Sequence, residues 1–154
     1  MPMPPAPKPQ LQWVTIGDTL YRHAVELRFK VLREPLGMPR GSEIYAHESD
    51  TLHLVAHEGE KVLGCVLLHP LGDGDSGKLL QMAVSPFWQG RGIGAVLVSA
   101  LEEKARELKL SRIVLNAREV AFPFYERLGY EYTGGYFEEV GIPHRAMAKP
   151  TTEP

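Results

Sequence analysis

The sequence predicts an α/β domain with a mixed central sheet of about seven strands flanked by about four helices. Short runs that alternate in polarity or are continuously apolar recur along the chain at the length of strands. Longer runs between some of them place apolar residues at helical spacing. The nearly continuous apolar run at residues 112–117 follows a long amphipathic helix, as a buried parallel strand follows a crossover helix.

The first part of the chain is expected to hold a tail, a strand, a helix and a loop. Prolines recur through residues 1–10, which predicts an extended, disordered tail. Residues 11–16 alternate as a strand does. Apolar residues at helical spacing predict a helix from the N-cap residue Asp18 to about Arg33, where a proline and a glycine stop it. Residues 38–50 are expected to form a loop or broken helix over the active site, and loops of this kind carry specificity.

The next part is expected to form a meander of three strands, residues 52–57, 62–68 and 78–84. A tight hairpin joins the first two strands, and the glycine- and aspartate-rich residues 72–77 form the second turn. That turn lacks the distal glutamate and the full spacing of an EF-hand loop, so a plain turn is predicted rather than a calcium site.

The rest of the chain alternates helices with strands. An amphipathic helix, a buried strand, a short helix ending at a C-cap glycine and two closing strands follow one another. Their predicted bounds are 93–108, 112–117, 120–128, 130–137 and 144–149. We therefore expect a single domain over residues 11–149, followed by a flexible C-terminal tail of residues 150–154.

The composition excludes several classes of partner. The 154 residues carry a formal net charge of −2, with a pI of about 6.3, so neither nucleic acid nor a membrane is expected as a partner. The only cysteine, Cys65, lies in an apolar strand and is expected to be a buried residue rather than a nucleophile. The six histidines show no metal-binding spacing, so no metal is expected. A single cysteine and the lack of a signal-peptide core favour a reducing compartment, the cytoplasm.

The most informative segment joins the third meander strand to the long helix through three alternating glycines, Gly90, Gly92 and Gly94. Glycine lets a backbone approach a ligand closely and adopt positive φ. The amides at the start of a helix lack backbone partners and point toward an anion. The junction is therefore expected to bind a ligand that carries phosphate.

Two nucleotide-binding loops fit this junction poorly. No Lys-Ser or Lys-Thr pair follows the glycines, as a P-loop would require. Gly90, Gly92 and Ala95 satisfy the dinucleotide pattern G-x-G-x-x-[GA], but the next strand ends at Asn116-Ala117 instead of an acidic residue. Three antiparallel strands also precede the loop. A nicotinamide cofactor stays an alternative on the residues alone.

Three segments resemble motifs of the GNAT superfamily of N-acetyltransferases. Residues 89–94 are similar to the family's coenzyme A loop, [QR]-x-x-G-x-[GA]. Residues 116–130, with Phe124-Tyr125 and a terminal Gly-Tyr, resemble its next conserved segment. Residues 137–144 resemble the closing hairpin of a subgroup of mostly uncharacterised members. The resemblance covers residues 11–149 and implies a GNAT-like fold whose parallel strands splay apart at the cofactor site.

The resemblance implies acetyl-CoA as co-substrate. The loop amides would wrap the pyrophosphate, with Arg91 adding positive charge, and the strand before the loop would pair with the pantetheine arm as an added strand does. Asn116 would hydrogen-bond the pantetheine arm or cap the helix that carries Tyr125. The residues expected to bind acetyl-CoA are Met82, Ala83, Val84, Gln89, Gly90, Arg91, Gly92, Ile93, Gly94, Asn116 and Tyr125.

The same resemblance implies a general acid but leaves the general base open. Tyr125 is expected to protonate the leaving thiolate, because a phenol is protonated at neutral pH; the alternative is a core aromatic. His144 and Glu139 rank first as the base because the closing hairpin passes near the acceptor cleft. Other side chains in segments that could face the acceptor are Glu43, His47, Glu48 and Glu138.

The function implied is that of an enzyme, an N-acetyltransferase that moves the acetyl group of acetyl-CoA to a primary amine of a small molecule by direct attack on the thioester. Two alternatives stay open: a catalytically silent acyl-CoA-binding or regulatory module, and acetylation of a protein N-terminal amine. The resemblance is also compatible with a homodimer.

Overall fold

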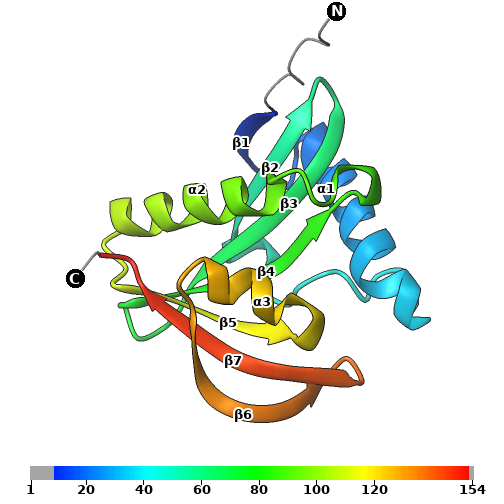
Figure 1. Cartoon of the computed structure of the whole chain (residues 1–154). Helices are drawn as coiled ribbons and strands as arrows, with labels where there is room; N and C mark the ends of the chain where they lie inside the picture. The colour runs from blue at the N-terminus through cyan, green and yellow to red at the C-terminus, as the bar shows by residue number, and fades with distance from the viewer. Residues whose placement is uncertain (1–8, 153–154) are drawn as a thin grey trace, which may run out of the picture.

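A single seven-stranded sheet with helices on both faces forms the body of the protein in the computed structural model, which describes residues 9–152 (Figure 1). The strands are β1 (Gln10–Val14), β2 (Leu52–Glu58), β3 (Lys61–Pro70), β4 (Ser76–Val84), β5 (Arg112–Arg118), β6 (Glu131–Glu139) and β7 (Ile142–Pro150). The α-helices are α1 (Thr19–Arg28), α2 (Ile93–Glu107) and α3 (Phe122–Arg127).

The sheet is mixed, as predicted. Its strand order is β1-β2-β3-β4-β5-β7-β6, and the only parallel pair in the described chain is β4 with β5. Helix α2 supplies the crossover between these two strands, because parallel neighbours cannot be joined by a hairpin. The β6–β7 hairpin closes the far edge of the sheet as a curved ribbon (Figure 1).

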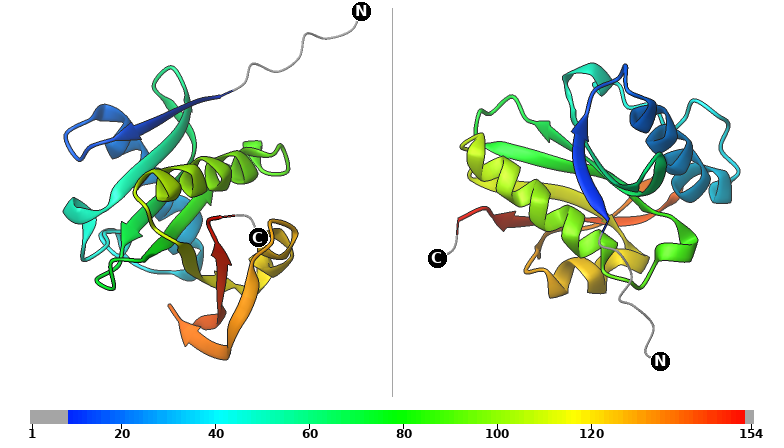
Figure 2. Two further views of the ribbon diagram at one scale, coloured as in Figure 1. Left: turned by 90° about the vertical axis from the view of Figure 1, so that its left-hand side faces the viewer. Right: turned by 90° about the horizontal axis from the view of Figure 1, so that it is seen from above.

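The central strands are buried on both faces, with α1 on one face and α2 on the other (Figure 2). Side chains along β2 point alternately to the two faces of the sheet, and each face has its own apolar cluster. Val55 packs with residues of α1, whereas Leu54 and Ala56 pack with residues of α2. The α2 cluster also contains Phe122 and Tyr125, so α3 shares the α2 face. Strands covered on both faces read as continuous apolar runs, which explains the sequence pattern of β2 and β3.

The helix after β1 and the closing hairpin differ from their predicted bounds. The helix expected to reach Arg33 is α-helical to Arg28 and continues as a π-helical segment, Phe29–Arg33. The closing hairpin turns at Val140–Gly141, both with positive φ as a two-residue hairpin turn requires, so that β7 starts two residues earlier than predicted. Residues 38–50 are mostly irregular, as expected, with one short 3-10 turn.

The folded region extends slightly further at both ends than predicted, because Gln10, Pro150 and Thr151 belong to the fold and not to the tails. Gln10 pairs with His57 at the start of β1, and residues 1–8 lie outside the described residues. At the other end Pro150 closes β7, and Thr151 is buried, with its hydroxyl donating to Leu110 O at 2.7 Å. A residue whose polar groups are buried and bonded belongs to the fold rather than to a flexible tail. Residues 153–154 lie outside the described residues.

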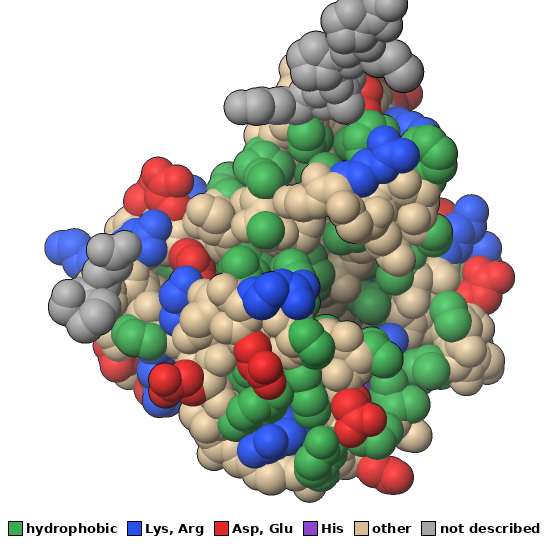
Figure 3. Space-filling view, viewed as in Figure 1, with side chains coloured by type: hydrophobic (Ala, Val, Ile, Leu, Met, Phe, Trp, Pro, Cys, Tyr) green, Lys and Arg blue, Asp and Glu red, His purple; other side chains and the backbone are tan. Residues whose placement is uncertain are grey.

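Charge is mixed over the surface. On the face shown in Figure 3, acidic and basic side chains are interspersed, in keeping with the small net charge. No helix in residues 9–152 is long and apolar enough to cross a membrane. Within the same residues, no group of three or more His, Cys, Asp and Glu side chains could hold a metal ion.

Candidate functional site

The parallel strands β4 and β5 part after three residue pairs. Ser76, Gly77 and Lys78 pair with residues 112–114, and the pairing ends there although both strands continue. Beyond that point β5 pairs only with β7, so the second half of β4 has an open edge toward β5. An open strand edge presents N–H and C=O groups that an extended ligand can pair with.

A β-bulge shapes β4 beside this opening. Cys65 pairs with Ala83 and Leu67 with Leu80, so two residues of β4, Gln81 and Met82, face one residue of β3. Gln81 has a positive φ of 47°, which is uncommon for a residue other than glycine.

A cavity of about 330 Å³ lies where the two strands part. Among the sequence-predicted site residues, the structure brings Met82, Asn116, Tyr125, Glu139 and His144 together in its wall. Ala83 and Val84 do not line it, and Ala83 packs toward α1 instead.

Two residues with a strained backbone line this same cavity. Gln81 and the hairpin residue Val140 have positive φ, and Val140 is β-branched, for which this conformation is a clear outlier. Strain of this kind persists where the surrounding structure enforces it and concentrates at functional sites. Two residues with positive φ thus border the cavity, one in the β4 bulge and one in the closing hairpin turn.

Tyr125 is buried on α3, with only 5% of its surface exposed. Its ring makes edge contacts with Phe124 and Tyr130, at centroid distances of 4.9 and 5.6 Å. Burial raises the pKa of Tyr125, so the phenol is protonated across the neutral range. No group in the described chain forms a hydrogen bond with its hydroxyl, which leaves that donor for a ligand in the cavity.

The Glu139 carboxylate joins three strands at the cavity wall. Asn116 Nδ2 on β5 donates to Glu139 Oε1 at 3.2 Å, and His144 Nε2 on β7 lies 3.6 Å from Glu139 Oε2. The other ring nitrogen of His144, Nδ1, donates to Ile142 O at 2.9 Å. His144 is almost fully buried, whereas the Glu139 side chain is 48% exposed. Glu139 is thus the accessible member of a fixed cluster.

The glycine loop lies between β4 and α2. Gly90 and Gly92 have φ values of 77° and 85°, and Gly92 is the N-cap of α2. In the described chain no backbone or side-chain acceptor bonds the amides of residues 90–95, so the predicted anion-binding donors are available. Gln89 differs from its expected role, because its amide donates to Pro86 O at 3.3 Å and its side chain donates to Val84 O at 3.0 Å.

The remaining loop residues pack around these amides. The Arg91 guanidinium lies over the Phe87 ring, with 4.6 Å from its central carbon to the ring centroid. Ile93 is buried beneath the start of α2, and a Cβ on Gly94 would stand 3.0 Å from the Phe124 ring. The first turn of α2 therefore sits directly against the sheet and against α3.

Gly64 of β3 sets how closely α2 approaches the sheet. A Cβ at this position would stand 2.9 Å from Ile93 Cγ2 and 3.2 Å from the Ala83 backbone oxygen. Gly64→Ala is expected to lower the free energy of unfolding by about 1–3 kcal/mol, the usual cost of overpacking. Chemical denaturation measures it, with Gly72→Ala as control because nothing lies within 4 Å of a Cβ there. Equal stability of the two variants would contradict this close packing.

The other candidate bases lie outside the cavity wall. Glu43 Oε2 accepts the amide hydrogen of Gly41 at 2.7 Å, His47 stacks on His69 at 5.0 Å, and Glu138 is exposed. Glu48 is committed to a buried ion pair with Arg28, whose Nη1 donates to Glu48 Oε1 at 2.6 Å. Of the six candidate bases, Glu139 and His144 line the cavity and these four do not.

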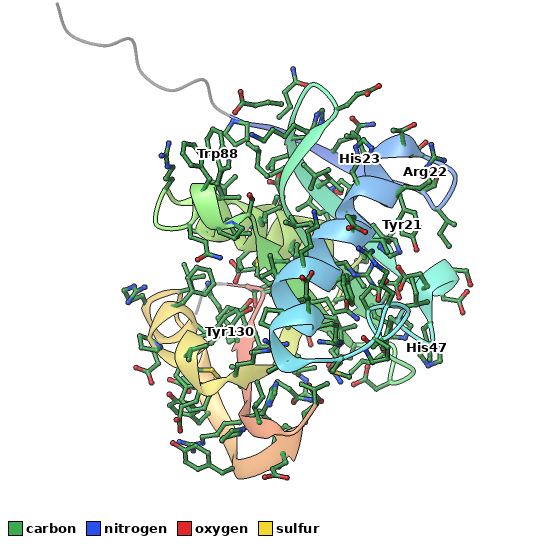
Figure 4. All side chains as sticks on the ribbon, turned by 90° about the vertical axis from the view of Figure 1, so that its right-hand side faces the viewer. Tyr21, Arg22, His23, His47, Trp88 and Tyr130 are labelled. Atoms are coloured by element: carbon green, nitrogen blue, oxygen red, sulfur yellow. The ribbon has the colours of Figure 1, made fainter. Side chains whose placement is uncertain are left out.

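The buried pair anchors the loop of residues 38–50 to the bulge in β4. Arg28 is fully buried; its Nε donates to Gln81 Oε1 at 2.7 Å and its Nη2 donates to Glu43 O. Tyr21 adds a 2.6 Å hydrogen bond to Glu48 Oε1, and Tyr21 and His47 lie on the α1 side of the molecule (Figure 4). One arginine thus connects α1, the loop and the strained residue Gln81.

Sequence reasoning missed three arginines in this region. Arg28 lies on the same face of α1 as the buried residues Tyr21 and Ala24. A charged residue at a position that the apolar spacing assigns to the core was the signal that could have identified it. Arg118 follows Asn116 by two residues on β5, so alternation along the strand placed both on one face. Arg33 also lines the cavity, and no sequence pattern distinguished it.

Comparison with known proteins agrees with the motif resemblance. The model of the acetyltransferase (GNAT) family matches residues 17–130. The chain is 33% identical over 129 residues to the uncharacterized N-acetyltransferase YjcF of Bacillus subtilis (strain 168), covering 83% of this chain and 91% of that protein.

Solved structures share the fold. Escherichia coli ElaA superposes with a TM-score of 0.78 at 20% identity, over 92% of this chain and 99% of that chain. An aminoglycoside 6'-N-acetyltransferase complexed with coenzyme A superposes with a TM-score of 0.78 at 17% identity, over 94% and 98%. The predicted GNAT-like fold is confirmed, and the chain belongs to the acetyltransferase (GNAT) family of enzymes.

Proposed function

We propose that this enzyme is an acetyl-CoA-dependent N-acetyltransferase whose acceptor is a primary amine of a small molecule. The observation that carries this proposal is the combination of three features in one region of the sheet: the open edge of β4, the free amides at the start of α2, and the cavity whose wall includes Tyr125. The fold neighbour complexed with coenzyme A supports the choice of ligand.

In this proposal the amides of residues 90–95 hold the pyrophosphate at the helix N-terminus, where partial positive charge favours an anion. Arg91 adds a cation at the same loop. Met82 and Ala83 lie on the stretch of β4 whose edge is open, so their backbone is placed to pair with the pantetheine arm. Val84 O already accepts from Gln89, and we therefore assign the contact at Val84 to its amide.

When bound, the thioester supplies the acetyl group; the chain's own residues position it and move protons. A carbon–nitrogen bond forms as the amine attacks the carbonyl carbon, and the carbon–sulfur bond breaks. Tyr125 donates its phenolic proton to the departing sulfur and regains one from solvent. The proton lost by the amine nitrogen goes to Glu139, directly or through a water molecule. Asn116 and His144 hold that carboxylate in place.

Thermal shift followed by a turnover assay tests the proposal. Acetyl-CoA is expected to raise the melting temperature and NAD to leave it unchanged. Release of free thiol from acetyl-CoA is then expected to rise above background with at least one primary amine from a panel of small amines and N-terminal peptides.

Each other outcome excludes a part of the proposal. Stabilisation by acetyl-CoA without thiol release on any amine would leave a silent acyl-CoA-binding module. Activity confined to peptides would replace the small acceptor by a protein N-terminus. Stabilisation by NAD alone would overturn the assignment of the loop to coenzyme A.

A further inference from the structure

Two guanidinium groups lie side by side in the cavity wall. Arg118 at the end of β5 donates from Nη2 to Leu32 O at 2.8 Å, and Arg33 donates from Nη1 to the same oxygen at 3.3 Å. Two donors that share one acceptor atom must be neighbours. Both side chains are half-buried and both line the cavity.

This pair of cations has no matched anion. Within residues 9–152 neither guanidinium lies within 4.0 Å of a carboxylate oxygen. Burial lowers the pKa of Arg33 and of Arg118. The charge of Arg28 lowers the pKa of Arg33 further, the charge of Arg33 lowers that of Arg118 further, and Glu139 offsets these effects only in part. Lys78 adds a third cation to the wall, against the single carboxylate of Glu139.

Most of the donors on these two groups are unused. A guanidinium carries five N–H donors. Arg33 uses Nε, toward Ser42 O, and Nη1, and Arg118 uses Nη2. Two adjacent planar forks with free N–H groups fit the oxygens of a carboxylate or a phosphate, which accept in pairs.

Acetyl-CoA does not account for this charge. Its phosphates belong, in the proposed function, to the loop of residues 90–95, and that loop does not line the cavity. The pantetheine arm and the thioester that would reach Tyr125 are uncharged. The anion expected at Arg33 and Arg118 therefore belongs to the acceptor.

We propose that the acceptor is a small primary amine that also carries a carboxylate or phosphate group, and that Arg33 and Arg118 bind that group; this rests on the proposed function. The spacing limits its size. Arg118 and His144 are direct partners across β5 and β7, and directly opposed residues place their Cβ atoms about 5 Å apart. Arg33, Arg118 and Glu139 also line one cavity of about 330 Å³, so an acceptor that reaches the arginines with its anion and Glu139 with its amine is a small molecule.

Matched substrate pairs test this charge preference. β-Alanine is compared with β-alaninamide, and O-phosphoethanolamine with ethanolamine; the two pairs separate carboxylate from phosphate. We expect kcat/KM to be roughly ten- to a hundredfold higher for the anionic member of at least one pair, the scale of charged hydrogen bonds. In Arg33→Gln and Arg118→Gln this ratio is expected to fall toward one, and Arg118→Lys to retain part of it.

Arg145→Gln is the matched control, because Arg145 stacks on Tyr132 outside the cavity and should leave the ratio unchanged. A wild-type ratio near one, a preference for the neutral amines, or a ratio that both glutamine variants retain would overturn the proposal.

A binding measurement keeps this test separate from that of the proposed function. With coenzyme A saturating the loop, inorganic phosphate or acetate is expected to raise the melting temperature of the wild type and not that of the Arg33→Gln/Arg118→Gln double variant. If no amine is acetylated, the proposed function fails, and this shift alone decides the anion site: its presence in the wild type supports the site, and equal shifts in both proteins exclude it.

Discussion

Replacing Tyr125 by phenylalanine is expected to lower kcat roughly a hundredfold or more, the scale of a lost general acid, while the Kd for acetyl-CoA changes by less than about threefold. The hydroxyl is the only atom removed, and in the described chain it has no hydrogen-bond partner whose loss would disturb the fold. Steady-state kinetics and calorimetric titration of acetyl-CoA measure the two quantities.

Tyr130→Phe is the matched control. Its hydroxyl donates to Glu102 at 2.9 Å outside the cavity, so its loss is expected to cost about 1 kcal/mol of stability and to leave kcat unchanged. Unchanged turnover in Tyr125→Phe would remove Tyr125 from the acid role. Because burial raises the pKa of Tyr125, deprotonation of its phenol is expected to cause no loss of kcat up to about pH 10.

Replacing Arg28 by methionine is expected to lower the free energy of unfolding by about 3–5 kcal/mol, because it leaves the Glu48 carboxylate buried without its cation. It also removes the bond that holds Gln81 at the bulge. Denaturant unfolding measures the loss of stability. Because Gln81 lines the cavity, loss of its hydrogen bond to Arg28 is expected to raise the KM for the amine.

Arg40→Met is the matched control. Arg40 pairs with Glu26 at 2.7 Å, but both side chains are exposed, so its replacement is expected to lower the free energy of unfolding far less than Arg28→Met does. The double variant Arg28→Met/Glu48→Gln is expected to be more stable than Arg28→Met alone. Equal destabilisation by Arg28→Met and Arg40→Met would contradict the importance of the buried pair.

The buried pair of Arg28 and Glu48 also predicts how the free energy of unfolding depends on pH. Burial alone would raise the pKa of Glu48, but hydrogen bonds from Arg28 and Tyr21 outweigh it and lower that pKa below its usual 4.5. A depressed carboxyl pKa contributes stability above the unfolded value, and this contribution is lost as the pH falls through the folded pKa. The stability difference between wild type and Glu48→Gln is therefore expected to shrink as the pH falls below about 4.5, and a constant difference would contradict it.

The elements of the fold could be predicted because each has a local cause. Continuous apolar runs marked the strands buried on both faces, and Gly92 marked the start of α2 by the positive φ it adopts. The ends were less predictable, because they depend on distant partners. Thr151 donates hydrogen bonds to the backbone oxygens of Leu110 and Ser111. A local sequence pattern cannot predict such contacts with residues some 40 positions away.

The candidate site shows the same division. Four of the predicted site residues lie in segments with recognisable motifs, and the structure brings all four to one cavity: Tyr125, Asn116, Glu139 and His144. Arg33 and Arg118 became neighbours only because the π-helical segment after α1 meets the end of β5, a contact between residues 86 positions apart in the chain from Leu32 to Arg118. The proposed specificity for the acceptor rests on this long-range contact, which sequence periodicity does not record.

The electron density of crystals grown with acetyl-CoA and no acceptor tests the central claim most directly. The account predicts the pyrophosphate against the amides of residues 90–95, the pantetheine arm along the open edge of β4, and the thioester sulfur within hydrogen-bond distance of the Tyr125 hydroxyl. Coenzyme A bound elsewhere, such as in the surface groove between Glu26, Lys61 and Pro86, or a sulfur remote from Tyr125, would contradict it.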